Sequence, residues 1–123
     1  MTDLLVDVDD HRLAATWTDD NQMTRAAIAA ALPLEVDAAR WGDELYGTIP
    51  VETTPERTQR RVEPGTIAYW PDGPAICLFW GPTPASTDTT PVAASPVAVV
   101  ATVTDYSPLA SIDGGARLQI KTA

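Results

Sequence analysis

The sequence predicts a mostly β-strand domain that folds as a closed or nearly closed antiparallel barrel with one α-helix. Over most of the chain, apolar residues alternate with polar ones in short runs, which is the period of a half-buried strand. Proline, glycine and aspartate separate these runs, and such residues favour turns. A single segment near residues 20–32 has the period of a helix instead. Many short strands with one helix are typical of closed antiparallel architectures.

The first third of the chain predicts a β-hairpin followed by this helix. Residues 4–8 and 13–17 alternate on either side of Asp9–His11, so we expect His11 at a solvated turn. Residues Asp19–Asn21 are suited to cap the helix, and Pro33 ends it. The predicted core-facing residues are small: Met23, Ala26, Ala27, Ala30 and Ala31.

The remainder predicts strands and turns. We expect strands at 34–37, 48–51, 66–70, 75–80, 97–104 and 117–121, a solvated loop at 52–61 and a short helical turn from Ser107. Residues 81–96 contain four prolines among small and hydroxyl residues, which predicts one long Pro/Thr-rich loop. Loops of this length in compact domains are usually functional or disordered.

Composition limits the class of protein. A chain of 123 residues predicts one domain over 1–123, and its net charge of −9 disfavours nucleic-acid partners and anionic membrane surfaces. The N-terminus lacks the basic start and apolar stretch of a signal peptide, so we expect a cytoplasmic protein. The cations are seven arginines and one lysine, and aspartate outnumbers glutamate. This pattern resembles that of proteins from salt-loving microbes and predicts a halophilic one.

The residues that could hold metals or perform nucleophilic chemistry are few. Cys77 is the one cysteine and lies in an apolar run, so we expect a buried thiol rather than a nucleophile. His11 has no cysteine or histidine near it. No Ser-His-Asp arrangement, glycine-rich phosphate loop or calcium loop is present, so we expect no metal and no cofactor.

Three blocks occur in order along the chain. They are Arg40–Tyr46 (Arg-Trp-Gly-Asp-Glu-Leu-Tyr), Gly65 with Tyr69–Pro71, and Cys77–Pro84 (Cys-Leu-Phe-Trp-Gly-Pro-Thr-Pro). Together they resemble a family of small stand-alone prokaryotic proteins with a cyclophilin-like fold. The resemblance covers most of the chain and implies an eight-stranded barrel with one capping helix. It implies no settled biochemical activity, because fold does not fix function.

The prolyl isomerases of this fold use an arginine beside a shallow apolar pocket. Their Gln-Gly-Gly-Asp-Phe stretch and Phe-Met pair are not found here, and the only histidine, His11, lies in another part of the chain. Arg40 is the one candidate for the electrophilic arginine. The nearby Asp43 or Glu44 could pair with it and occupy its donors.

The predicted site is a pocket at the barrel rim that binds a small molecule or an extended peptide. Its candidate residues are Arg40, Trp41, Glu44, Tyr46, Thr83 and Ser86. We expect Trp41 and the long loop to border one cavity. We expect the aromatics of strands 66–70 and 75–80 to pack in the core; an outward aromatic on both strands would instead form a platform for a ligand. Three alternatives remain open: an exposed bend without a ligand, a divergent prolyl isomerase using Arg40, and a structural protein that acts by oligomerisation. The oligomeric state is not predicted.

Overall fold

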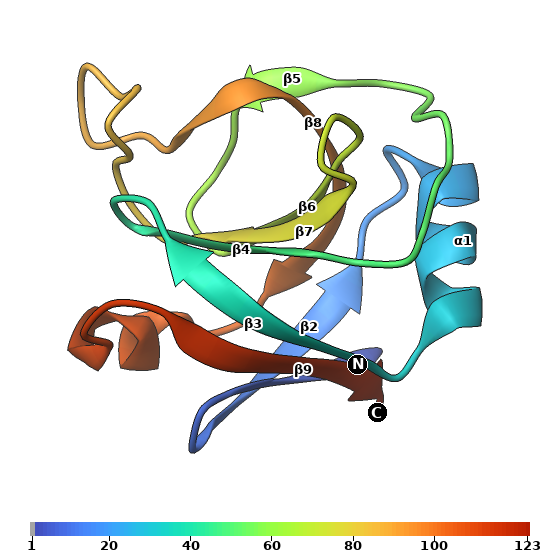
Figure 1. Ribbon diagram of the computed structural model, residues 1–123, viewed down its shortest axis with the longest axis horizontal. Coiled ribbons are helices and arrows are strands. Elements are labelled where there is room, and N and C mark those ends of the chain that lie inside the picture. Colours follow the sequence, from blue (N-terminus) through green and yellow to red (C-terminus); the bar gives the residue numbers. More distant parts are fainter. Residues whose placement is uncertain (1) are drawn as a thin grey trace.

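The computed structural model describes residues 2–123 and is built mainly from β-strands (Figure 1). In chain order the elements are β1 (Leu4–Val8), β2 (His11–Trp17), α1 (Gln22–Ala31), β3 (Leu34–Arg40), β4 (Glu44–Thr48), β5 (Gln59–Arg61), β6 (Thr66–Trp70), β7 (Ala75–Phe79), β8 (Val92–Val103), the 3₁₀ helix η1 (Ser107–Ser111) and β9 (Ala116–Thr122).

Eight of these strands form a closed antiparallel ring. The order is β2-β1-β9-β3-β4-β7-β6-β8, and pairing of β2 with β8 closes it. The short strand β5 is not part of the ring and pairs only with the first half of β8. The predicted closed barrel and the N-terminal hairpin, with Val8 opposite His11, are therefore confirmed.

Two hydrophobic clusters lie on opposite faces of the strands. The larger fills the ring and includes Leu45, Ile76 and Leu78. The smaller lies outside the ring, between β4, β7 and β6 on one side and β5 with the first half of β8 on the other. Its members are Val62, Ala68, Cys77, Phe79, Ala93, Val97 and Val99, with Tyr46 and Trp70 packed against them. Side chains alternate along each strand, so β4, β6 and β7 serve both clusters.

The predicted helix is confirmed, but its predicted cap is wrong. Asn21 at the N-cap makes no capping hydrogen bond, because its amide donates to the Val99 carbonyl and accepts from the Arg57 N–H. The Glu56 carboxylate accepts instead from the N–H groups of Met23 and Thr24, at 2.7 and 3.2 Å. A residue distant in sequence thus satisfies donors that every helix start leaves free.

The predicted core-facing side of the helix is also shifted by one residue. Thr24 and Ile28 are buried, and Ala27 and Ala31 pack against the cluster inside the ring. Met23 is 73% exposed, and Ala26 and Ala30 are exposed as well. The larger Ile28 therefore sets the packed face. Within residues 2–123, no helix is long and apolar enough to cross a membrane.

Two predicted segments need correction. The strand expected at 48–51 is β4, Glu44–Thr48, so residues assigned to a bend are paired with β7. The loop expected at 81–96 ends earlier, since β8 begins at Val92. The polar segment 52–61 is a loop as predicted, except that its last three residues form β5.

Candidate functional site

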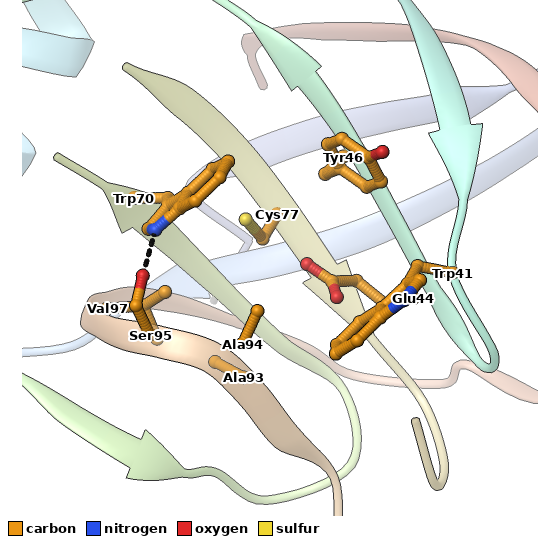
Figure 2. Close-up of a pocket in the computed structure, with 9 residues that line it drawn as sticks. All are labelled: Trp41, Glu44, Tyr46, Trp70, Cys77, Ala93, Ala94, Ser95 and Val97. Atoms are coloured by element: carbon orange, nitrogen blue, oxygen red, sulfur yellow. Dashed lines mark hydrogen bonds between the residues drawn. The ribbon is translucent and has the colours of Figure 1, made fainter. Parts of the chain in front are cut away.

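A cavity of about 230 Å³ opens onto the outer cluster, outside the ring (Figure 2). Strands β4, β6 and β7 supply one wall, and the first half of β8 supplies the other. Trp41 lies at one end, in the turn between β3 and β4. The lining residues are Trp41, Glu44, Tyr46, Trp70, Cys77, Ala93, Ala94, Ser95 and Val97.

Glu44 carries the carboxyl group of this cavity. Its side chain comes from β4, lies next to Cys77 of β7 and points into the middle of the lining residues (Figure 2). Of the 17 acidic residues, all in the described part of the chain, only Glu44 is buried, at 6% exposure. Burial raises the pKa of Glu44 to about 7, against a smaller opposing effect of the Cys77 thiol. The group therefore changes charge near neutral pH.

Three aromatic rings surround this carboxyl: Trp41, Tyr46 and Trp70. Tyr46 and Trp70 meet edge to face, with ring centroids 6.5 Å apart. The Trp70 indole N–H donates to the Ser95 hydroxyl, which in turn donates to Asp72 at 3.2 Å. This chain of hydrogen bonds ties β6 to β8 and fixes one wall of the cavity.

Gly42 positions Trp41. Its φ of +62° lies in the left-handed region, and a Cβ there would come within 2.8 Å of the Thr83 backbone. The backbone of Asp43 bonds the segment Cys77–Pro84. Its carbonyl accepts from the Trp80 N–H and its N–H donates to the Pro82 carbonyl, both at 3.0 Å. The Trp-Gly-Asp-Glu block (41–44) and the Trp-Gly-Pro block (80–82) therefore lie against each other and are joined by backbone hydrogen bonds.

Arg40 does not line the cavity. Its guanidinium donates to the carbonyls of Gly42 and Ile112 and to the Asp43 carboxylate at 3.0 Å, and it lies 5.3 Å from the Trp80 ring centroid. Each of its three nitrogens donates one hydrogen bond within the protein. Arg40, predicted as a pocket residue, instead connects the turn between β3 and β4 to the segment after η1.

Thr83 and Ser86 also lie outside the cavity. The Thr83 hydroxyl donates to the Val92 carbonyl, and the Ser86 hydroxyl donates to the Thr90 carbonyl at 2.7 Å. These bonds fold the segment between β7 and β8 onto itself. Three of the six predicted site residues, Trp41, Glu44 and Tyr46, come together, and the other three have structural contacts.

The residues that the site prediction omitted come from β6, β7 and β8. The sequence did not say which aromatic of each adjacent pair faces outward: Trp70 lines the cavity, whereas Phe79 is fully buried in the outer cluster. Ala93–Ser95 fall within the segment 81–96 that was predicted as a loop. These residues border the same cavity as Trp41, but they belong to strand β8. Cys77 is buried as predicted, and burial raises the pKa of its thiol well above the usual range.

Potential metal ligands are dispersed. Across residues 2–123, no three histidine, cysteine or acidic side chains gather where they could hold a metal ion.

The model of the cyclophilin-like family matches residues 2–121. The chain belongs to the cyclophilin-like family. A solved structure supports this: a hypothetical protein of Archaeoglobus fulgidus, studied in solution, superimposes with a TM-score of 0.80 and 33% sequence identity. The match covers 99% of this chain and 95% of that one, so the aligned region spans nearly all residues described above. A search of curated proteins found no match.

Proposed function

We propose that this cyclophilin-like protein is a binding module whose cavity takes a small molecule or one side chain of an extended peptide. The observation that carries the proposal is a largely apolar cavity that contains a single, nearly buried carboxyl group. Apolar walls with few convergent polar groups are the usual composition of ligand sites. A carboxyl is retained in such a place at a cost in stability, which favours a functional role.

The size of the cavity limits what can enter. At about 230 Å³ it is smaller than the ~300–1,000 Å³ that is typical of drug-sized ligand sites. It therefore suits a fragment-sized molecule or one side chain, while the rest of a longer ligand would lie outside. The prolyl isomerase alternative has no supporting observation, since Arg40 does not line the cavity and its guanidinium bonds Gly42, Asp43 and Ile112.

The proposal is tested by mapping where ligands bind. We expect small aromatic and amide fragments to shift the backbone NMR signals of residues 44–46, Cys77 and 93–97. The variant Ala94→Phe should abolish these shifts, because Ala94 is exposed at the edge of the cavity and a larger side chain would obstruct it. Ala26→Phe, on the exposed side of α1, is the matched control. Shifts that survive Ala94→Phe, or that cluster on 81–91 instead, would contradict the proposal.

A further inference from the structure

We propose that the ligand of this cavity carries an organic ammonium group and that Glu44 is its counter-ion. The inference rests on the proposed function and names the ligand chemistry. It follows from three properties of the site: a buried carboxyl without a cationic partner, aromatic walls, and a further acid at the edge.

The first property is the missing counter-charge. None of the eight lysine and arginine side chains, all within the described chain, forms an ion pair with Glu44. Arg40, the nearest in sequence, pairs with Asp43 instead. A buried carboxylate is normally paired, because an isolated one is strongly destabilised. A ligand cation would supply the partner that the protein does not.

The second property is the set of walls. Trp41, Tyr46 and Trp70 surround the carboxyl (Figure 2). Aromatic faces attract cations through their quadrupoles, most strongly for tryptophan and most of all where water is excluded. An alkylammonium ion combines a positive charge with apolar methyl or methylene groups. It can therefore satisfy the carboxylate and the apolar lining together.

The third property is the charge around the site. Asp72 accepts from Ser95 of the lining, and the whole chain has a net charge of −9. The field at the cavity edge therefore attracts cations. Of the other groups in this region, the buried Cys77 thiol has a raised pKa and stays uncharged, Asp43 is paired with Arg40, and Arg60 of β5 does not line the cavity and donates to the Ala93 carbonyl.

Cation binding requires the ionised form of Glu44, so it is linked to a proton. Because the pKa of Glu44 is raised to about 7, a bound cation displaces a proton near neutrality. Affinity should rise about tenfold per pH unit below pH 7 and level off above it. A neutral ligand that accepts a hydrogen bond from the protonated acid would show the reverse dependence.

The test uses choline and 3,3-dimethyl-1-butanol, which have the same shape but differ in charge. Binding is followed by the fluorescence of Trp41 and Trp70, assigned with Trp41→Phe and Trp70→Phe, at one KCl concentration that keeps the protein folded. We expect choline to bind at least about tenfold more tightly than the neutral alcohol at pH 8, and this preference to shrink at pH 5.5. Equal binding of the two probes, or a preference that grows at low pH, would overturn the inference.

Two variants of equal net charge separate the site from the general field. Glu44→Gln should remove the preference for choline and its pH dependence, while Glu52→Gln, at an exposed position away from the cavity, should keep both. Loss of the preference in both variants would assign it to overall charge and contradict the role of Glu44. If neutral fragments bind and choline does not, only this inference is refuted. If neither binds, the proposed function is refuted as well.

The ammonium group could belong to a free molecule or to a peptide side chain. A glycine-flanked peptide with one trimethyllysine, titrated beside choline, distinguishes the two sources. Tighter binding of the peptide assigns the site to a modified or basic segment of a partner, and equal or weaker binding assigns it to a free cation. If neither probe binds, the inference is wrong.

Discussion

At the scale of single residues, Glu44 makes the stability of the free protein depend on pH near neutrality. The pKa of its carboxyl is about 7 in the folded chain, against 4.5 for an ordinary glutamate. Between these values the folded protein holds a proton that the unfolded chain has lost. The contribution of Glu44 to the free energy of unfolding therefore falls as pH rises from 4.5 to 7 and does not change further above 7. The difference corresponds to at most about 3 kcal/mol, a large share of the ~5–15 kcal/mol that stabilises a domain.

The variant Glu44→Gln isolates this effect. Because glutamine has no charge to bury, we expect the variant to gain stability over the parent by up to about 3 kcal/mol at pH 8 and by little at pH 4.5. Denaturant unfolding at both pH values measures the difference, with Glu52→Gln as the control for net charge. A difference between variant and parent that does not change with pH would contradict the assigned pKa.

Arg40 illustrates how a candidate residue can have a different role. A catalyst of prolyl isomerisation must favour the twisted amide over the planar one, whereas the Arg40 guanidinium lies outside the cavity and is held by Gly42, Asp43 and Ile112. We therefore predict no acceleration of a protease-coupled assay on an Ala-Pro-Phe peptide in a folded sample. Acceleration that disappears in Arg40→Ala would contradict this prediction.

The same residues show what the sequence could indicate about the site. The conjunction of Trp41, Glu44 and Tyr46 was predictable because they lie close together in the sequence. The pairing of Arg40 with Asp43 was one of the two pairings anticipated. The position of Arg40 outside the cavity was not predictable, because the strand was expected at 48–51 and not at Glu44–Thr48. Only pairing with β7 sets the alternation that turns Glu44 and Tyr46 to the outer face and Leu45 into the ring.

At the scale of elements, α1 depends on the loop that follows β4. Glu56 bonds both the Met23 and the Thr24 N–H, and these bonds lower the pKa of its carboxyl. We predict that Glu56→Ala lowers the temperature of unfolding and speeds hydrogen exchange in α1, whereas Glu52→Ala does neither. Equal behaviour of the two variants would show that the helix start does not need this cap.

Strand β8 shows why one element could not be predicted from local pattern. Its first half contains Ser95 and Pro96 and resembles a loop, yet it pairs with β5 through Gln59–Val97 and Arg61–Val92. Strand β5 is short and polar, and the first half of β8 mixes small apolar residues with Ser95 and Pro96, so only their long-range register makes them strands. The second half, Val97–Val103, was predictable because it is buried and rich in β-branched residues.

At the scale of the whole molecule, the predicted closed ring is confirmed, while the second cluster outside it was unforeseen. The surface is acidic: apart from Glu44, every acid in the described chain is exposed or half-buried. Mutual repulsion among them opposes compaction, and salt screens it. We therefore predict that the temperature of unfolding rises from low to multimolar KCl. A temperature that stays level or falls would contradict the halophilic interpretation of the composition.

The central claim is that Glu44 is a titrating group that meets the ligand inside the cavity. A carbon-13 NMR titration of its side-chain carboxyl, with and without saturating choline, tests it most directly. We predict a midpoint near pH 7 in the free protein and a lower midpoint with choline, because the cation stabilises the carboxylate. A midpoint near 4.5 in the free protein, or one that choline leaves unchanged, would contradict the account.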